Sequence, residues 1–384
     1  MSPGDIDIRP LRGRRAIEDW LDVPERIYAD DPNFIAPLRL VERERISPRH
    51  NPFFSYGEAE MFVAYANGVP AGRISAQVNR KHLAHNQDGT GFFGFFDCVP
   101  DEAVASKLVA AAADWLAARG MTGMRGPFNL TINQDIGLLI DGFDCPPAIL
   151  TSHAAPWTGG LAEACGLTKA MDLYAFRMSP SSAPREFQRL ANFAKSSNRV
   201  RIRQVRMDKF AEEAHLVFDI FNDAWSDNWG FEPVTEPDIK AMIRDIRPIM
   251  RSKFGWIAEI DGEPAAMMIV LPDINHVVRG FKGRLLPFNW AKLAYEIYAD
   301  RWETARVPLL GIRKRYRDTI LAPGVLSLLI SDFMELGKGY NIDWIEYSWI
   351  LETNAPMVNL AKMAAGPPAR TYRVYEKALS SSDA

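Results

Sequence analysis

The sequence has few cysteines, and the motifs that would make them functional are missing. Its 384 residues contain three, Cys98, Cys145 and Cys165, without a C-x-x-C pair. An odd number at wide spacing indicates neither a disulfide framework nor a thiolate metal site. The metal spacing H-x-x-x-H, the Walker loop and the nucleophile motif G-x-S-x-G are also missing. We therefore expect the three cysteines to be reduced residues of the core, and we expect no bound metal.

The sequence also lacks an excess of either charge and any long apolar run. Forty-five basic and forty-eight acidic residues give a net charge of -3, which disfavours nucleic acid as a partner. No run approaches the roughly 18 apolar residues that a membrane-spanning helix needs, and residues 1–7 do not begin a signal peptide. We expect a cytoplasmic protein whose only membrane contact is peripheral, at the inner membrane.

The remaining composition is that of a packed protein, with 47% apolar and 24% charged residues. The length exceeds what one core usually supports, so we expect two domains. The junction is predicted at residues 179–198, a stretch first rich in Ser and Pro and then basic. Residues 1–178 and 199–384 are the predicted domains.

Both halves show one order of elements. Each has a hairpin signal, Asn67-Gly68 in the first and Asp261-Gly262 in the second, flanked by strand-like residues. Strands and helices alternate after each hairpin, and predicted strands include Ala148–Thr151 in the first half and Tyr372–Lys377 at the end of the second. This order predicts an α/β fold with a mixed sheet, duplicated in architecture. Residues 272–305 are an insertion in the second copy.

The most informative segment runs from a predicted strand through a basic turn into a helix. It reads Leu310-Gly311-Ile312-Arg313-Lys314-Arg315-Tyr316-Arg317-Asp318-Thr319-Ile320-Leu321-Ala322. The first N–H groups of a helix have no internal partners and lie at its positive pole, so a pyrophosphate can bind there. A basic turn that merely caps a helix is the structural alternative.

This segment resembles the cofactor loop of the GNAT acyltransferase superfamily, R/Q-x-x-G-x-G/A. Arg317, Ile320 and Ala322 stand at the motif positions, with Ile320 in place of the first glycine. The resemblance implies two tandem GNAT folds and an acyl-CoA donor held by Ile312, Arg313, Arg315, Arg317, Ile320, Leu321 and Ala322. The equivalent stretch of the first half, residues 96–101, is acidic, so residues 1–178 are predicted to lack a coenzyme A loop.

Two carboxylates near the fifth strand of the second copy are candidates for the base that deprotonates an amine. Glu346 is the first choice and Glu352 the second, and Tyr347 is a candidate proton donor to the leaving thiolate. The structural alternatives for Glu346 are a pair with one of the nearby arginines or a carboxylate at the sheet edge that faces water. We further expect N–H groups near Ile312 and Arg313 to polarise the thioester carbonyl.

The acceptor side is predicted from aromatic and polar residues. Trp225 and Trp229 end the first helix of the second copy, and the resemblance places this helix end, with Asn354, at the acceptor; a helix stop signal is an equally good interpretation of the tryptophans. Asp135 and His153 of the first half are weaker candidates, because a turn and core interpretation fits them.

Across nearly its whole length the sequence is similar to bacterial GNAT-like proteins that include bacterial ceramide synthases. The similarity is carried by residues 28–34, 92–97, 125–127, 141–144 and 373–377. It implies N-acylation of a lipid amine, a sphingoid base first, by a long-chain acyl-CoA. Another amine acceptor, such as an aminoacyl group or a polyamine, and a non-catalytic acyl-CoA or lipid sensor stay open as alternatives.

Overall fold

The structure is a computed structural model that describes residues 5–180, 185–340 and 342–379. The chain forms two compact units. Unit 1 consists of Met1–Leu173, Val278–Asn289 and Arg370–Ala384, and unit 2 of Tyr174–Val277 and Trp290–Ala369. Residues 181–184 of the predicted linker lie outside the described residues. The predicted domain boundaries therefore remain a prediction beside these two units.

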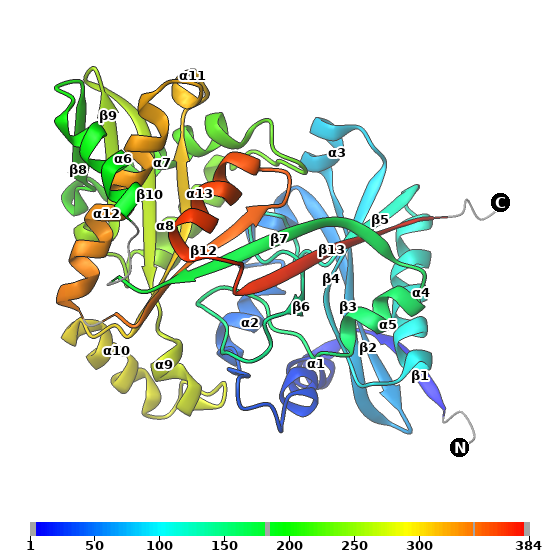
Figure 1. The fold of residues 1–384 in the computed structure, drawn as a ribbon. Coiled ribbons are helices and arrows are strands. Elements are labelled where there is room, and N and C mark those ends of the chain that lie inside the picture. The colour runs from blue at the N-terminus through cyan, green and yellow to red at the C-terminus, as the bar shows by residue number, and fades with distance from the viewer. Residues whose placement is uncertain (1–4, 181–184, 341, 380–384) are drawn as a thin grey trace. The chain divides into compact units, whose positions relative to one another are not determined.

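Unit 1 is a mixed sheet with helices (Figure 1). Its helices and strands are β1 Ile6–Pro10, α1 Gly13–Ile27, α2 Arg39–Arg45, β2 Gly57–Ala66, β3 Val69–Asn79, α3 Arg80–Asn86, β4 Thr90–Cys98, α4 Glu102–Ala117, β5 Gly123–Gly126, β6 Leu138–Asp141, α5 Thr158–Ala164, the first part of β7 Thr168–Met178, and β13 Arg370–Ala378. The strand order is β1-β2-β3-β4-β5-β13-β7, and β6 also pairs with β13.

Unit 2 repeats this architecture. Its helices and strands are the last part of β7, α6 Arg185–Ser196, β8 Val200–Gln204, α7 Phe210–Trp225, α8 Glu236–Ile246, β9 Gly255–Ile260, β10 Glu263–Pro272, α9 Asn275–Val278, α10 Asn289–Ala299, β11 Thr304–Ile312, α11 Lys314–Arg317, α12 Leu321–Gly339, β12 Trp344–Leu351 and α13 Ala355–Ala365. The strand order is β7-β12-β11-β10-β9-β8.

The strands of the two units share their directions as well as their order. In unit 1, β1 to β4 are successively antiparallel and β4 is parallel to β5. In unit 2, β8 to β11 are successively antiparallel and β11 is parallel to β12. The predicted duplication of a mixed α/β architecture is therefore confirmed.

Both predicted hairpins form. Asn67 and Gly68 join β2 to β3, and Asp261 and Gly262 join β9 to β10, all four with positive φ. Positive φ at both central positions is the geometry of a type I′ turn, which Asn-Gly and Asp-Gly adopt with little strain.

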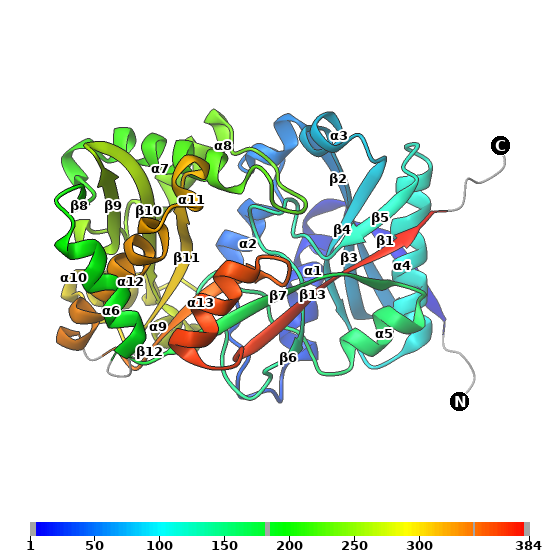
Figure 2. The same cartoon turned by 45° about the horizontal axis from the view of Figure 1, so that its top comes forward.

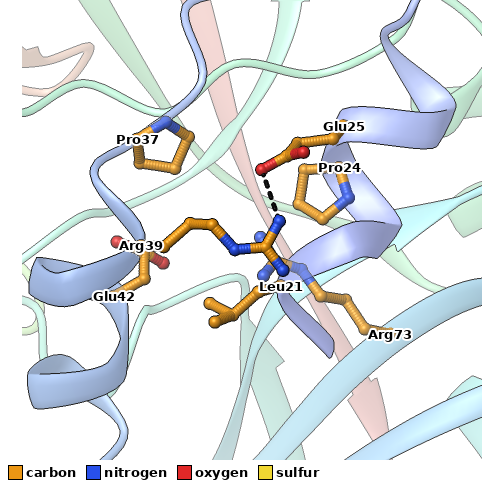
Figure 3. A pocket seen from close by; sticks show the side chains of 7 residues that line it. All are labelled: Leu21, Pro24, Glu25, Pro37, Arg39, Glu42 and Arg73. Atoms are coloured by element: carbon orange, nitrogen blue, oxygen red, sulfur yellow. Dashed lines mark hydrogen bonds and ion pairs between the residues drawn. The ribbon is translucent and has the colours of Figure 1, made fainter. Parts of the chain in front are cut away.

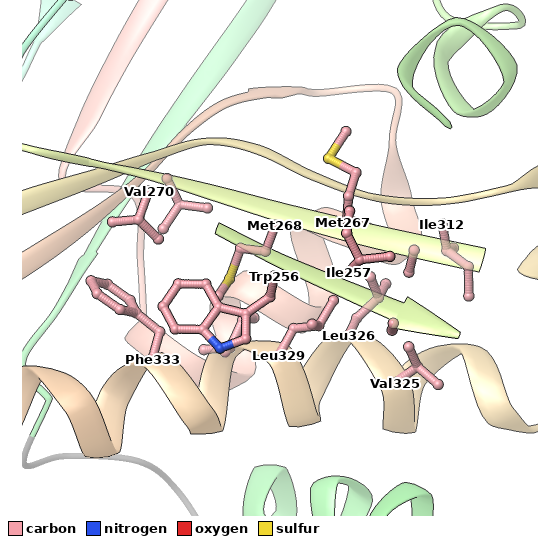
Figure 4. Packing of buried hydrophobic residues seen from close by; sticks show 14 of the residues in the cluster. Trp256, Ile257, Met267, Met268, Val270, Ile312, Val325, Leu326, Leu329 and Phe333 are labelled. Carbon is pink, nitrogen blue, oxygen red and sulfur yellow. The ribbon is translucent and has the colours of Figure 1, made fainter. Parts of the chain in front are cut away.

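The core of unit 2 lies between its sheet and α12. Figure 4 shows Trp256 and Met268 from the sheet against Leu329 and Phe333 of the helix, all buried. Only the short helix α11 and its flanking residues separate the end of β11 from the start of α12.

Part of the predicted linker is a helix. In α6, Phe187, Ala191 and Ala194 are buried at helical spacing, and α6 packs along α12 (Figure 2). Gly324 of α12 permits the close approach, because a Cβ there would lie 3.0 Å from the carbonyl oxygen of Leu190. The polar residues that suggested a linker lie on the solvent face of an amphipathic helix.

The last strand of each predicted copy belongs, wholly or in part, to the unit formed by the other half of the sequence. The last strand, β13, pairs with β5 and β6 in unit 1, and residues 174–178 of β7 belong to unit 2. The predicted strand Ala148–Thr151 is wrong, since these residues are irregular, whereas β6 at Leu138–Asp141 is a strand. Its partner β13 is remote in sequence, so no local signal marked it.

Candidate functional site

Strands β11 and β12 part halfway along their length in unit 2. The parallel pairing runs from Thr304↔Trp344 to Val307↔Tyr347 and ends there, although β11 continues to Ile312 and β12 to Leu351. Two parallel strands that separate in this way leave one edge of each without a ladder partner. A ligand with an extended backbone can pair with such an edge.

The pairing of β11 with β10 determines which backbone N–H groups of β11 point toward the gap. The N–H of Arg313 donates to the carbonyl of Ala265, at 2.8 Å, so in the antiparallel ladder with β10 the N–H groups of Leu310 and Ile312 point away from β10. Of the two predicted carbonyl-polarising residues, Arg313 uses its N–H within the sheet, and Ile312 directs its N–H toward the gap.

The basic turn after β11 is held by carboxylates. The Arg313 side chain donates to Asp219 at 2.5 Å, and the Lys314 N–H to Asp223 at 2.8 Å. Arg315 pairs with Glu263, and Arg317 donates to the carbonyl of Ala224. The further partner of Lys314 and Arg317 is Asp227, whose side chain is 63% exposed. An incoming phosphate could replace this exposed carboxylate at little cost, because exposed ion pairs are worth about 1 kcal/mol or less.

The start of α12 carries no side-chain cap. Ile320 stands at the N-cap in helical geometry without a capping hydrogen bond and is 80% exposed. Ala322 donates to Thr319, and Leu321 and Ala322 are buried by their side chains. Pro323 has no N–H, so an anion at this end of the 19-residue helix would be held by the N–H of Leu321 and by the positive pole of the helix. Because the φ of Ile320 is negative, its conformation does not require glycine.

Glu346 lies in a buried polar cluster on β12. Its carboxylate is fully buried and accepts hydrogen bonds from Arg177, at 2.9 Å, and from the Ser348 hydroxyl, at 3.0 Å. Arg306, its neighbour in the β11–β12 register, donates to Ser348 and lies over the ring of Trp349. The bond from Arg177 is the arginine pairing that the sequence had left open.

Tyr347 and Glu352 lie on β12 and directly after it. Tyr347 occupies the last paired position, and its buried hydroxyl has no hydrogen-bond partner within the described residues. Burial raises the pKa of this phenol, so it stays protonated. Glu352 is half-buried in the turn after Leu351, beyond the point where the strands part.

The three predicted acceptor residues, Trp225, Trp229 and Asn354, lie in three different surroundings. Trp225 stacks on Phe221 with ring centroids 4.8 Å apart and lies against β11, since a Cβ at Gly311 would be 2.2 Å from its ring. Trp229 is half-buried in the loop after α7. The Asn354 side chain accepts from the N–H of Met357 and caps α13, so its geometry is that of a structural cap.

The corresponding region of unit 1 is filled by its own chain. Strands β4 and β5 also part, after Phe92↔Arg125. Beyond that point the N–H of Phe128 donates to Phe93 and the N–H of Phe95 to the Asn129 side chain, both at 2.7 Å. The carboxylate of Asp101 caps α4 by accepting from Ala103 and Val104. The edge and the helix start that are open in unit 2 are therefore both occupied here.

A small hollow in unit 1 is occupied by charges that satisfy one another. Its lining residues are Leu21, Pro24, Glu25, Pro37, Arg39, Glu42 and Arg73. Arg39 donates to Glu25 at 2.9 Å (Figure 3) and also to Asp22 and Glu18. Since the guanidinium already has three carboxylate partners, this hollow does not present free charge to a ligand.

Unit 1 contains a second polar cluster that the sequence marked only weakly. The Tyr28 hydroxyl donates to Asp97 at 2.5 Å, and Asp97 also accepts from Arg73 at 2.7 Å. His153 bonds to Asp31 at 2.7 Å, and its ring packs against that of Tyr28. Asp135, the other weak candidate, is bound to Arg45 at 2.8 Å. Only the fold brings residues 28–34 to positions 97 and 153.

Two further properties concern membranes and metals. Within residues 5–180, 185–340 and 342–379, no helix has the length and apolar character to cross a bilayer. In the same ranges no three His, Cys, Asp or Glu side chains gather as metal ligands would.

Comparisons with known proteins give the family and the fold. The bacterial ceramide synthase of Caulobacter vibrioides (strain NA1000 / CB15N) is 37% identical over 380 residues, covering 98% of each chain. Protein YghO of Escherichia coli (strain K12) is 35% identical, covering 96% of this chain and 95% of that one. No family model matches the sequence.

Two solved structures share the fold. A tandem GNAT protein from the clavulanic acid biosynthesis pathway has a TM-score of 0.58 at 12% identity, covering 99% of this chain and all of the other. A GCN5-related N-acetyltransferase from Sphaerobacter thermophilus has a TM-score of 0.53 at 11% identity, covering 97% and 96%. The chain belongs to the family that includes bacterial ceramide synthase, and it is an acyl-transferring enzyme built from two GNAT folds in tandem.

Proposed function

We propose that the chain transfers an acyl group from acyl-CoA to the amine of a lipid acceptor, with a sphingoid base as the first candidate. The observation that carries this proposal is the parting of β11 and β12 after Val307↔Tyr347, next to a helix start without a cap. The 37% identity to a bacterial ceramide synthase supports the choice of acceptor.

The donor is proposed to bind in unit 2. Its extended pantetheine arm would pair with the open edge of β11, where the N–H groups of Leu310 and Ile312 are directed toward the gap. Its pyrophosphate would accept from the N–H of Leu321 at the positive pole of α12, with Lys314 and Arg317 released from Asp227 to neutralise it. The closed edge and the capped α4 of unit 1 support the assignment of one donor site to the chain.

The proposed reaction is direct attack of a neutral amine on the thioester. The C–N bond forms as the C–S bond breaks, the electron pair of that bond leaves with the sulfur, and the proton that the amine loses ends on the thiol. An N–H of β11 bound to the thioester oxygen would stabilise the negative charge that develops there. Tyr347, still protonated, is proposed to donate a hydrogen bond to the leaving thiolate.

The contacts of Glu346 and Glu352 indicate different roles for the two carboxylates. The carboxylate of Glu346 is held by the Arg177 guanidinium and the Ser348 hydroxyl, contacts that suit a positioning role. We therefore propose that Glu346 positions β12 through Arg177 and Ser348 and that Glu352 is the base. Trp225, in contact with β11, and Trp229 are proposed to border the acceptor.

Helix α10 is proposed to bring the enzyme to an anionic phospholipid surface, where a lipid acceptor is found. None of its residues is buried. At 100° per residue, its exposed residues Trp290, Ala291, Ala294, Tyr295 and Tyr298 share one face, which carries no charge. The nearby cations Lys292 and Arg301 have no ion pair within the described residues. An aromatic face with basic residues at its margin complements an anionic membrane.

A thiol-release assay tests the proposed reaction. Purified protein is offered acetyl-CoA or palmitoyl-CoA together with sphinganine, 3-ketosphinganine or spermidine. Release is expected only with palmitoyl-CoA and a sphingoid amine. Release with spermidine would instead establish a polyamine acceptor, and acyl-CoA binding without release from any pair would favour a sensor.

Variants in the same assay test the roles of the carboxylates. Glu352→Gln is expected to lower kcat about 100-fold or more, as for the loss of a general base. Glu335→Gln, an exposed glutamate on α12 paired with Lys338, is the control and should leave kcat unchanged. A full-activity Glu352→Gln enzyme would remove Glu352 as the base.

A further inference from the structure

His153 in unit 1 has one ring nitrogen bound and the other without a partner. Its Nε2 bonds to Oδ2 of Asp31 at 2.7 Å, whereas its Nδ1 is buried and unpaired within the described residues. The histidine side chain is 5% exposed, and that of Asp31 is 25% exposed. The pair therefore lies just below the surface of unit 1.

A second histidine of unit 1 shows what a fully satisfied pair looks like. The Nε2 of His82 bonds to Asp88 at 3.0 Å, and its Nδ1 bonds to the side-chain amide of Asn86 at 3.0 Å. Its side chain is 4% exposed, so the two histidines are equally buried. They differ in that, of the two, only His153 has an unsatisfied nitrogen, and a buried polar atom without a partner is unfavourable unless something binds it.

The Asp31 contact fixes which nitrogen of His153 carries the proton. Burial alone would raise the pKa of Asp31, but the hydrogen bonds from His153 and from the Asn33 N–H outweigh it, and the pKa is lowered. An ionised carboxylate only accepts, so Nε2 carries the hydrogen. Burial lowers the pKa of His153 despite the attraction of Asp31, so the ring is neutral and Nδ1 presents its lone pair.

The groups around His153 are held in place by one another. Asn33 donates to the carbonyl of Phe143 at 3.0 Å, which fixes the loop that carries Asp31. The Tyr28 ring packs edge-on against the imidazole, and its hydroxyl is committed to Asp97, which is bound to Arg73. These neighbours are thus mutually satisfied, and Nδ1 is the acceptor that this cluster leaves open. This is the arrangement of an oriented base.

We propose that His153 is the hydrogen-bond acceptor of a ligand site inside unit 1, whose ligand presents a primary amine or a hydroxyl. The class that fits is an amino alcohol head group. Its ammonium or its hydroxyl would donate a hydrogen bond to the unpaired Nδ1. No proton is transferred, and the Nε2–H stays on Asp31. Only the choice of an amino alcohol as probe rests on the proposed function.

The test follows the imidazole nitrogens by NMR in the full-length protein labelled with ¹⁵N-histidine. His153→Gln identifies the signal of interest, because glutamine keeps an amide N–H for Asp31 and removes the Nδ1 acceptor. The probes are sphinganine, octadecylamine and N-acetylsphinganine, each in detergent. Sphinganine is expected to shift the Nδ1 signal of His153 and leave that of His82 in place. Binding to His153→Gln is expected to be about tenfold weaker, and binding to His82→Gln unchanged.

The other two probes separate the chemistry of the ligand. A shift with octadecylamine assigns the amine as donor, and a shift with N-acetylsphinganine assigns a hydroxyl. If no probe moves the His153 signal, or if His82→Gln weakens binding as much as His153→Gln, the proposal is overturned. If His153→Gln does not fold, Asp31→Asn identifies the same signal, because it changes the partner of Nε2. Thiol release from acyl-CoA is measured separately, so failure of this site and failure of the proposed function are distinguishable.

Discussion

At the scale of single residues, the packing of Trp225 against β11 requires a glycine at position 311. A Cβ at Gly311 would lie 2.2 and 2.4 Å from two ring atoms of Trp225, and that ring is itself fixed by stacking on Phe221. The glycine thus allows an indole to lie against the strand that is proposed to hold the donor. Its role is close approach, since its φ is not positive.

Gly311→Ala is expected to destabilise the protein by about 1–3 kcal/mol, because a rigid ring must move to admit the methyl group. The urea midpoint of unfolding measures this. Gly339→Ala, where a Cβ meets nothing within 4 Å, is the control and should not lower the midpoint. Since Trp225→Leu removes the clash, Gly311→Ala should cost less in that background; equal costs in both backgrounds would contradict the explanation.

The site residues show how far residue types alone carry an interpretation. Glu346 and Tyr347 were proposed because a carboxylate and a phenol near a predicted strand end suit amine chemistry. Nothing local showed that Arg177, 169 positions away, would bind Glu346. The pairing depends on which strands become neighbours, so it could not be predicted from the spacing along β12.

At the scale of elements, α10 is unusual because a helix normally buries one face. Its five exposed residues on one face are two alanines, two tyrosines and a tryptophan, and the chain leading into it also exposes Leu286 and Phe288. The helix is part of the insertion predicted at residues 272–305, which the sequence marked by its position between the hairpin and the next strand.

Trp290→Ser with Tyr298→Ser is expected to reduce binding to vesicles containing phosphatidylglycerol at least tenfold, because two aromatic side chains no longer enter the interface. Cosedimentation measures the bound fraction. Phe193→Ser, which removes an aromatic that is 46% exposed on α6, should leave binding unchanged. Equal binding of the wild type and the double variant would exclude α10 as the membrane contact.

At the scale of the whole molecule, unit 1 is completed by the end of the chain. Strand β13 contributes the buried residues Arg370, Tyr372, Val374 and Tyr375 to it. It also supplies Arg373, which binds Asp172 at 2.8 Å, and Glu376, which pairs with Arg125. Unit 1 therefore cannot form its full sheet from the first half of the sequence.

A chain that ends at Ala369 is expected to lose several kcal/mol of stability in unit 1, since each large buried side chain removed costs about 2–5 kcal/mol. Hydrogen exchange measured by mass spectrometry should show peptides of β4 and β5 losing protection while those of β9 and β10 keep it. A chain that ends at Leu379 retains β13 and serves as the control. Retained protection in β4 and β5 after the shorter truncation would show that unit 1 does not need β13.

The sequence by itself determined the features set by neighbouring residues. The two hairpins were predictable because Asn-Gly and Asp-Gly adopt positive φ, and the passage from β11 through a basic turn into α12 followed from local composition. The repetition of these signals predicted the duplicated α/β architecture, because period and turn chemistry act over a few residues.

Tertiary structure decided what depends on segments far apart in the chain. It assigned β13 to unit 1, turned part of a polar stretch into the packed helix α6, and ended the β11–β12 pairing at Val307. It also joined Asp31 to His153 across 122 positions. Such contacts depend on which strands and loops pack together in the folded chain, and local propensity does not specify these long-range partners.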